Sequence, residues 1–310
     1  MNISVIIPVY NAAAFVQKAV CSALFHKEVK EVVVVDDGST DTSLAILQTL
    51  QESDSRIKIY HHENNVNKGR SASRNLALRK ATQPFIAFLD ADDFYLENRF
   101  IKDIELFSSN NSIDGVYNAI GVHFYRNATE DEKGLLELTT VTELIPPAVL
   151  FETLLSGKKG YFSIDGLTIK REVINKIGYF NEHLIVAEDT DWILKMALKT
   201  ILIAGIIDKP VTLRGVHEKN SFSNEDLYKV YRVKMYESLL VWCINEKILL
   251  NRIEGIIKLV FIYRIRYGKT FWEDFLYWSK FAFYYPRLLK TEIFLKNFPL
   301  ISRRKILFKK

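Results

Sequence analysis

Three aspartates stand within four positions at Asp90, Asp92 and Asp93, directly after an apolar run at 85–89. Such a run is typical of a buried strand, so these acids lie where the chain leaves a sheet. Crowded carboxylates repel one another unless a cation or hydrogen bonds offset their charge. Oxygen ligands of this kind suit Mg²⁺ or Mn²⁺, which carboxylates hold together with substrate phosphates. The pattern favours a metal site, while a helix-capping loop is the alternative, above all for Asp93.

These carboxylates need a scaffold, and the first half of the chain alternates strand and helix signals. Apolar runs that predict strands lie at 4–9, 31–35, 57–60 and 85–89. Segments with helical spacing lie at 12–25, 41–51 and 70–81. Strands that are apolar throughout and separated by helices indicate a mostly parallel sheet covered on both faces, with ligands at the carboxyl ends of the strands. The acidic strand ends Asp36-Asp37 and Asp90–Asp92 should therefore share one crevice.

Charge and aromatic content divide the chain near residue 215. With 310 residues, one large domain plus an appendage is expected. Residues 1–215 carry 23 Lys and Arg against 28 Asp and Glu, whereas 216–310 carry 19 against 9. The same C-terminal part contains 20 of the 39 aromatic residues. A change this large in composition predicts a domain boundary.

The cysteines and the N-terminus indicate the compartment. Met1-Asn2 leads directly into the first apolar run, so no secretory leader is expected. No apolar stretch approaches the ~20 residues that span a bilayer. Cys21 and Cys243 stand in no metal-binding or redox spacing, so both are expected to be reduced and buried. We therefore expect a cytoplasmic protein.

Five segments in order resemble the motifs of the family 2 glycosyltransferases, which have the Rossmann-like GT-A fold. These segments are 4–11, 33–41, 67–75, 88–93, and 178–182 together with 187–189. The resemblance implies an α/β GT-A domain at 1–215, with a mostly parallel sheet flanked by helices. Residues 216–310 lie outside the resemblance and are expected to form a helical extension. The implied activity is transfer of a sugar from a nucleotide diphosphate to a hydroxyl acceptor, with inversion at the anomeric carbon.

The resemblance also implies which residues contact the nucleotide. Asp37 would accept a hydrogen bond from the base, or it would instead bind the amides of its own turn, a role that suits Asp36 better than Asp37. Arg74 would reach the pyrophosphate with a bidentate guanidinium, or it would pair with the acidic strand ends. Tyr10 could be a simple strand-end aromatic, and Asn67 a loop-turn residue. The implied set is Pro8, Tyr10, Asp37, Asn67, Arg74, Asp90 and Ala91.

For the metal, the resemblance implies direct coordination by Asp92, while Asp90 would bind the metal, its waters or the ribose. His217, which two serines follow closely, would complete the metal shell or touch the pyrophosphate. A bound Mn²⁺ or Mg²⁺ would neutralise the charge that develops on the departing diphosphate. The segment 214–217 is one residue longer than the arginine-X-histidine spacing expected for the family.

Asp189 is the implied general base, because inverting displacement needs a carboxylate near the acceptor hydroxyl, opposite the leaving group. It stands beside Glu188 before a helix expected at 191–199. The alternative is an N-cap, which Asp189 or Asp191 could supply. Lys195 replaces an arginine that is common after this motif in the family.

Basic and aromatic residues are mixed in the C-terminal part, where helices are expected at about 225–250, 251–268 and 271–285. Amphipathic segments of this kind suit the headgroup layer of an anionic membrane. A helical cap packed on the catalytic domain is the alternative. Nucleic acid could use the same charges, but no binding motif supports a nucleic-acid partner.

The sequence thus predicts a hexosyl- or N-acetylhexosaminyltransferase that uses a nucleotide sugar, expected to be a UDP sugar. The expected acceptor is a cell-surface glycan, such as lipopolysaccharide or capsule, or a lipid-linked glycan at the inner face of the cell membrane. A polyprenyl-phosphate glycosyltransferase and a catalytically silent sugar-nucleotide-binding protein are the alternatives. A processive synthase is disfavoured, because the chain has neither bilayer-spanning runs nor a Gln-X-X-Arg-Trp motif.

Overall fold

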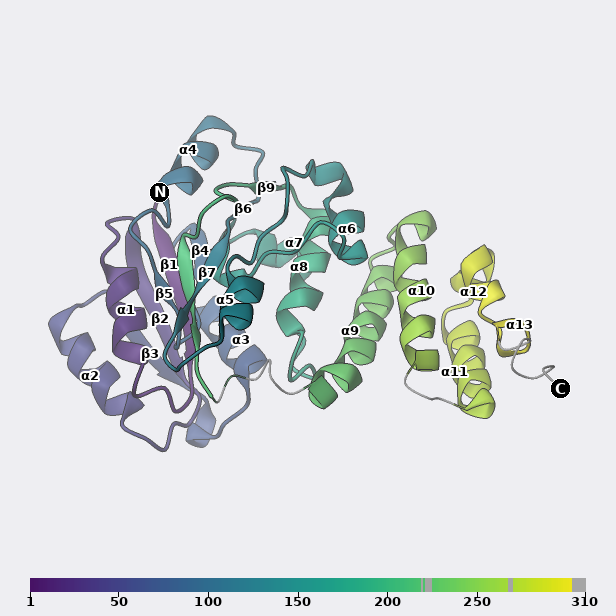
Figure 1. Ribbon diagram of the computed structural model, residues 1–310, viewed down its shortest axis with the longest axis horizontal. Helices are drawn as coiled ribbons and strands as arrows, with labels where there is room; N and C mark the ends of the chain where they lie inside the picture. The colour runs from purple at the N-terminus through teal and green to yellow at the C-terminus, as the bar shows by residue number, and fades with distance from the viewer. Residues whose placement is uncertain (219, 221–224, 267–269, 303–310) are drawn as a thin grey trace. The chain divides into compact units, whose positions relative to one another are not determined.

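The computed structural model describes residues 1–218, 220, 225–266 and 270–302 (Figure 1). The chain divides into two compact units, Met1–Ser221 and Phe222–Lys310. The first unit extends past the predicted boundary at 215. Its last residues belong there because Gly215 N donates to Asp93 Oδ1 at 2.9 Å, and Asn220 Nδ2 donates to Asp92 Oδ2 at 3.2 Å.

The first unit alternates strands and helices, and the four predicted strands are its first four (Figure 1). Its strands are β1 (Ile3–Val9), β2 (Val29–Asp36), β3 (Ile57–His61), β4 (Phe85–Phe88), β5 (Phe94–Tyr95), β6 (Gly115–Tyr117), β7 (Ile120–Phe124), β8 (Leu167–Lys170), β9 (Leu202–Ala204) and β10 (Thr212–Val216). Its α-helices are α1 (Val16–Leu24), α2 (Ser43–Ser53), α3 (Arg70–Lys80), α4 (Ile101–Ser109), α5 (Glu130–Leu136), α6 (Pro147–Ser156), α7 (Val173–Ile177) and α8 (Glu188–Lys199).

A seven-stranded sheet with the order β3-β2-β1-β4-β8-β6-β9 forms the centre of this unit. The strands β1 to β4 pair in parallel, whereas β8 runs antiparallel to both of its neighbours. Val5 and Ile7 of β1 pack in one cluster with Val16 of α1 and Leu47 of α2. Figure 1 shows α1 and α2 on one side of the sheet and α3, which contacts β1 and β2, on the other. Coverage of both faces explains why β1 and β2 are almost continuously apolar.

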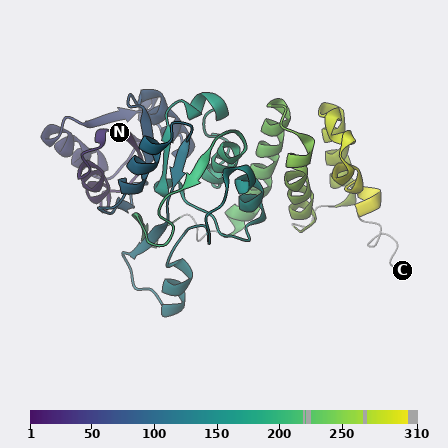
Figure 2. The same ribbon diagram turned by 90° about the horizontal axis from the view of Figure 1, so that it is seen from above.

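A second sheet, with the order β5-β10-β7, was not predicted. Its strand β10 pairs antiparallel with β5 and parallel with β7. Short strands carry little periodicity, so their pattern does not reveal them. The residues before β8 form a 3₁₀ turn at Ile164–Gly166, and β8 follows directly. The segment 108–160 contains α5, and Figure 2 shows this helix projecting from the rest of the unit.

The second unit is helical in its described residues. Its helices are α9 (Glu225–Asn245), α10 (Leu250–Arg266), α11 (Phe271–Tyr284), α12 (Glu292–Lys296) and α13 (Pro299–Ser302). The three helices predicted here correspond to α9, α10 and α11, with 267–268 outside the described residues. Throughout the described part of the chain, no helix combines the length and the apolarity needed to cross a bilayer.

The two cysteines are both free thiols. Cys243 on α9 is buried, as predicted. Cys21 is exposed on α1, which corrects the expectation that both would be buried. Its position on this amphipathic helix explains the difference, because Val16, Ala19, Val20 and Ala23 form the buried face.

Candidate active site

The carboxyl ends of β1, β2 and β4 meet at one edge of the large sheet. Val9 pairs with Asp36 across β1 and β2, and Ile6 pairs with Phe88 across β1 and β4. The N–H of Asp37 donates to the carbonyl of Val9 at 2.7 Å. The acidic segments that follow β2 and β4 therefore lie at the same edge, as the sequence predicts.

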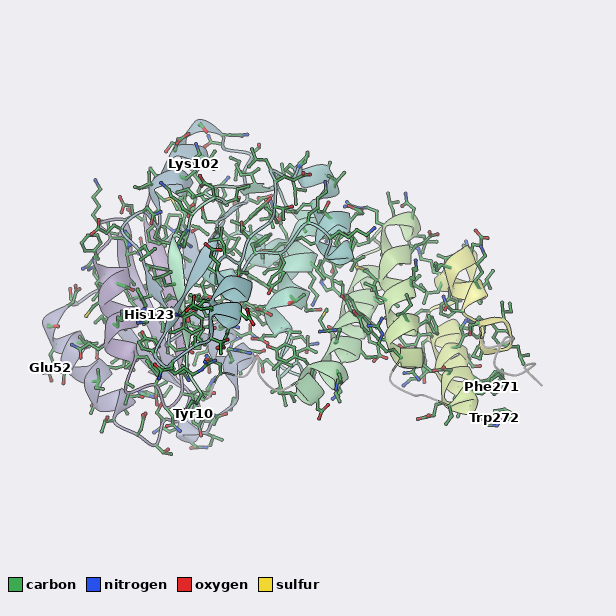
Figure 3. The ribbon with its side chains drawn as sticks, in the orientation of Figure 1. Tyr10, Glu52, Lys102, His123, Phe271 and Trp272 are labelled. Carbon is green, nitrogen blue, oxygen red and sulfur yellow. The ribbon has the colours of Figure 1, made fainter. Side chains whose placement is uncertain are left out.

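Several residues predicted to contact the nucleotide lie along this edge. Pro8 is half-buried near the end of β1, and Tyr10 follows it with 52% of its surface exposed (Figure 3). Asp37 is buried, and its carboxylate accepts hydrogen bonds from Lys68 N at 2.8 Å and Gly69 N at 2.9 Å. These bonds anchor the start of α3 to the end of β2.

Asn67 is exposed on the loop before α3. This loop lies against Gly38, where a Cβ atom would come within 2.5 Å of Asn65 O and 3.1 Å of Asn67 N. Gly38 also has φ +74°, a conformation that other residues adopt only with strain. The glycine therefore allows the loop that bears Asn67 to reach the end of β2. Of the two aspartates, Asp36 is the one that binds an amide of the turn, since its carboxylate accepts a hydrogen bond from Ser39 N at 3.2 Å.

Arg74 on α3 joins the strand edge to α8. Its side chain is buried, with Nη2 2.5 Å from Asp90 Oδ1 and Nη1 2.8 Å from Glu188 Oε1. Arg70 Nε contacts the same Glu188 oxygen at 2.7 Å. Burial lowers the pKa of Arg74, but the charges of Asp90 and Glu188 outweigh burial and raise it. Arg74 thus makes the acid contacts that the sequence left open for it, and its contact with a pyrophosphate stays a prediction.

The same contacts set the charge state of the two acids. Burial raises the pKa of Asp90, but the Arg74 and Arg70 guanidiniums outweigh it and lower the pKa overall. Burial raises the pKa of Glu188, and the two guanidiniums only partly oppose that rise. Asp90 is therefore held as a carboxylate at the sheet edge. Ala91, which follows it, has a methyl group packed in the core, so a nucleotide could meet only its backbone.

Asp92 and His217 lie side by side at the edge of the second sheet. Asp92 Oδ2 is 2.9 Å from His217 Nε2 and 3.2 Å from Asn220 Nδ2. Burial and the charge of Asp90 raise the pKa of Asp92, whereas the hydrogen bond to His217 opposes them. The His217 ring stacks on Phe15, with ring centroids 4.8 Å apart and an interplanar angle of 16°. The serines noted after His217, Ser221 and Ser223, lie outside the described residues.

A buried carboxylate pair, Asp93 and Asp165, lies beside Asp90. Oxygens of these three residues lie within 4.8 Å of one another. Asp165 Oδ1 accepts from Asp90 N at 3.0 Å, and Asp93 Oδ1 accepts from Gly215 N at 2.9 Å. Burial, followed by the charge of Asp90, raises the pKa of Asp165 to about 6, while Arg214 opposes the rise. Asp93 thus binds β10 and caps no helix, which decides against the capping alternative.

Two groups of side chains could hold a cation, and they differ in access. The predicted ligands Asp90, Asp92 and His217 have side chains that are 26%, 28% and 18% exposed. Asp93 and Asp165 are only 3% and 2% exposed, and both already accept backbone hydrogen bonds. The ligand oxygens that gather within 4.8 Å of one another belong to Asp90, Asp93 and Asp165, whereas the side chains of the predicted group are the more accessible ones. Its carboxylate-rich donors suit Mg²⁺ or Mn²⁺.

Asp189 lies half-buried on the first turn of α8. All residues of this helix are described, and it begins after Ala187, at φ 62°, without a side-chain cap. Neither Asp189 nor Asp191 is the N-cap residue, but Asp189 Oδ1 accepts a hydrogen bond from the first-turn N–H of Thr190 at 2.7 Å. Asp191 is buried inside the helix instead, 2.5 Å from Lys195 Nζ.

The two acidic segments converge around Arg74. This guanidinium contacts Asp90 after β4 and Glu188 at the start of α8. Burial lowers the pKa of Arg74 and of Arg214, and nearby carboxylates raise both, with Asp189 adding the smallest rise to each. The arrangement can thus place one carboxylate beside a cation site and another on the adjoining helix.

Sequence reasoning did not single out Arg70, Asp165 or Asn220. Arg70 stands four positions before Arg74, a spacing that puts both on one helix face and could have revealed it. Asn220 follows His217 by three positions, as turn partners often do. Asp165 is a lone acid in a mostly apolar stretch, and only the fold shows its partners.

Comparison with known proteins gives a consistent result. A profile described as Glycosyl transferase family 2 matches residues 4–178. An uncharacterized glycosyltransferase of Haemophilus influenzae is 30% identical over 180 residues, which are 58% of this chain and 66% of that protein. The poly(ribitol-phosphate) beta-N-acetylglucosaminyltransferase TarS of Staphylococcus aureus is 32% identical over 255 residues, or 77% of this chain and 41% of TarS. The chain thus spans less than two thirds of the length of these curated relatives.

Solved structures share the fold. TarS 1–349 of S. aureus in complex with UDP-GlcNAc superposes with a TM-score of 0.60 at 20% identity, covering 100% of this chain and 93% of that one. The mannosyltransferase PcManGT of Pyrobaculum calidifontis, in complex with GDP-Man and Mn²⁺, gives 0.53 at 16% identity, covering 100% and 88%. These likenesses establish the GT-A fold with C-terminal helices. Because the profile match covers more than half of the residues and the first four predicted motifs, this chain belongs to glycosyltransferase family 2.

Proposed function

We propose that the protein is an inverting, non-processive glycosyltransferase that moves a sugar from a UDP sugar to a hydroxyl group of a cell-surface glycan. The Arg74 bridge carries this proposal, because it joins the Asp90 segment to the helix start that bears Asp189. Inverting transfer needs both a site for the diphosphate and a carboxylate near the acceptor. The UDP-GlcNAc complex of TarS supports a UDP sugar as the donor.

The nucleoside would lie along the ends of β1 and β2. Pro8 and Tyr10 would line its slot, and Asn67 would lie across from them on the loop before α3. The Asp37 carboxylate accepts one backbone hydrogen bond on each oxygen. Since each carboxylate oxygen has a second lone pair, Asp37 can still accept a hydrogen bond from the N–H of a uracil.

Asp92, Asp90 and His217 would hold a Mn²⁺ or Mg²⁺ ion. When bound, such an ion neutralises charge on the departing diphosphate. The donor chemistry of this group supports the assignment, as does the raised pKa of Asp92, which burial and the Asp90 charge cause. The Mn²⁺ in the PcManGT complex is consistent with it. The Asn220 amide, 3.2 Å from Asp92 Oδ2, would orient the Asp92 carboxylate.

Asp189 would take the proton from the acceptor hydroxyl. The ion pairs that Glu188 makes with Arg70 and Arg74 hold the first turn of α8 in place. This turn positions Asp189, which is half-buried and which would face the incoming acceptor. We propose a glycan or lipid-linked glycan as that acceptor, at the inner face of the cell membrane.

A thermal-shift screen of nucleotide sugars, with and without Mn²⁺, tests the donor. A ligand that binds only the folded state raises the melting temperature. We expect UDP-GlcNAc or another UDP sugar to raise it more with Mn²⁺ than without, and GDP-Man to have a smaller effect. If no nucleotide sugar raised the melting temperature with either Mn²⁺ or Mg²⁺, the proposal would be wrong.

Donor hydrolysis separates the two alternatives. A transferase should hydrolyse its donor slowly in the absence of an acceptor, whereas a silent binding protein would bind the sugar nucleotide and leave it intact. A polyprenyl-phosphate transferase would transfer the labelled sugar to polyprenyl phosphate and not to a glycan hydroxyl. The proposal requires labelled sugar on a glycan acceptor.

A further inference from the structure

One face of α11 exposes large apolar side chains. Trp272, Leu276 and Phe283 are 68%, 67% and 80% exposed. Their spacing places the three residues within about 40° of one another around the helix axis. Figure 3 shows Trp272 standing out from the start of α11. We call these three residues the α11 stripe.

The opposite face of α11 packs on its own unit. Asp274 contacts Arg264 of α10 at 3.2 Å, and Arg264 also lies over the ring of Tyr277 at 3.5 Å. Trp278 Nε1 donates to Phe294 O at 2.9 Å, and Phe281 is buried. The helix is thus fixed by its inner face, so the outward direction of the α11 stripe is set by packing.

One exposed cation lies along the α11 stripe, and the sequence that follows it is basic. The exposed Lys280 lies between Leu276 and Phe283, at i+4 from the first and i−3 from the second. From residue 280 to the C-terminus the sequence contains nine Lys and Arg but one acidic residue, Glu292. The second unit, 222–310, contains 18 Lys and Arg against 8 Asp and Glu, a balance of +10. Aromatic and aliphatic side chains among cations are typical of helices that lie in the headgroup layer of an anionic bilayer.

We propose that the α11 stripe docks the protein on an anionic lipid bilayer, with Trp272, Leu276 and Phe283 entering the headgroup layer. Charge decides between this occupant and a second copy of the chain. Two copies of a unit with a net charge of +10 repel each other, whereas an anionic membrane surface attracts each copy. Insertion of the stripe into the headgroup layer also removes its apolar surface from water, which is favourable. This inference rests on the proposed function in one respect, because docking would bring the enzyme close to a lipid-linked acceptor.

Vesicle flotation of the full chain tests docking. Vesicles of phosphatidylcholine alone are compared with vesicles that contain about one third phosphatidylglycerol. We expect binding to the anionic vesicles at low ionic strength and weaker binding at high ionic strength.

The variant W272S/L276S/F283S should partition onto these vesicles about tenfold less, or weaker still. The matched control F25S/I101S/L144S, which removes apolar residues that are 68%, 63% and 69% exposed in the first unit, should partition as the unmodified protein does.

Tryptophan emission gives a second measurement that needs only a conservative change. Addition of anionic vesicles should shift the emission of the protein to shorter wavelength, and W272F should abolish the shift. A shift that persists in W272F overturns the proposal. Equal flotation of the stripe variant and the unmodified protein also overturns it, as does failure of the unmodified protein to float.

Light scattering checks the competing occupant. If W272S/L276S/F283S converted a dimer into a monomer and left vesicle binding unchanged, the α11 stripe would be a protein contact and the proposal would fall. All flotation experiments omit donor and acceptor. Loss of docking would therefore leave the transferase proposal standing, and failure to bind a nucleotide sugar would leave docking standing.

Discussion

Arg74 and Glu188 are 114 positions apart in sequence, yet Arg74 Nη1 donates to Glu188 Oε1 at 2.8 Å, with both side chains almost completely buried. The other terminal nitrogen of Arg74 contacts Asp90 Oδ1 at 2.5 Å. A buried ion pair adds little net stability, but removal of one partner leaves an uncompensated charge. The bridge therefore fixes α3, the end of β4 and the start of α8 relative to one another.

Arg74→Met should lower the free energy of unfolding by about 3–5 kcal/mol, because it leaves buried carboxylates without their partner. Urea unfolding measures this change. Arg79→Met, on an exposed position of the same helix, should change it by about 0.5 kcal/mol or less. Adding Glu188→Gln to Arg74→Met should recover part of the loss. A loss below about 1 kcal/mol for Arg74→Met would contradict the bridge.

Asp189→Asn should lower kcat by about 10²–10⁴-fold, since an amide cannot take the proton from the hydroxyl group of the acceptor. The KM for the donor and the melting temperature should change little, because the partly exposed carboxylate does not hold α8 in place. Steady-state kinetics with a labelled UDP sugar measure these quantities. Asp208→Asn, at an exposed carboxylate, serves as the control. A kcat within tenfold of the unmodified value would exclude Asp189 as the base.

Asp92→Asn and Asp165→Asn should separate the two candidate cation groups. We expect Asp92→Asn to abolish the part of donor binding that depends on Mn²⁺, because it neutralises an accessible ligand. Asp165→Asn should retain that part, since its carboxylate is buried and bonded to Asp90 N. Calorimetric titration of UDP with and without Mn²⁺ checks both. The opposite result would move the ion to Asp93 and Asp165.

Phe15→Ala should weaken metal binding, although Phe15 is not itself a predicted metal ligand. The Phe15 ring stacks on His217 and lies 4.7 Å from the ring of Tyr125, so its loss frees the imidazole to rotate. Residues that orient a ligand typically contribute about 10–100-fold in metal affinity. The concentration of Mn²⁺ that gives half-maximal activity should rise accordingly, and Phe25→Ala, at an exposed ring, should not change it. Equal metal requirements in both variants would refute the role of Phe15.

His26 should make stability fall in mild acid. Burial, followed by the charge of Arg99, lowers the pKa of His26 to about 4 from 6.5. The unfolded chain therefore binds a proton between these values while the folded protein does not. Stability is fully present above pH 6.5 and is lost as pH falls towards 4, by about 2–3 kcal/mol. His26→Phe should flatten this slope in denaturant titrations, whereas His183→Phe, at an exposed histidine, should leave it intact.

Much of the first unit could be read from local patterns. The apolar runs predicted β1 to β4, because strands buried on both faces must be apolar throughout. Parallel pairing then brought the acids after β2 and β4 to one edge. The strands β5, β7 and β10 escaped prediction, since β5 has two residues and both β7 and β10 interrupt their apolar residues with glycine and polar side chains. This second sheet is what places His217 beside Asp92.

The sequence by itself thus determined the GT-A fold, the family and the carboxylates available for chemistry, because these depend on apolar periodicity and on residue types within short motifs. Only the tertiary structure decided the partners. It paired Arg74 with Glu188 and His217 with Asp92, and it left Trp272, Leu276 and Phe283 facing outwards from α11. Contacts across more than a hundred residues follow from the path of the whole chain, which no local pattern encodes.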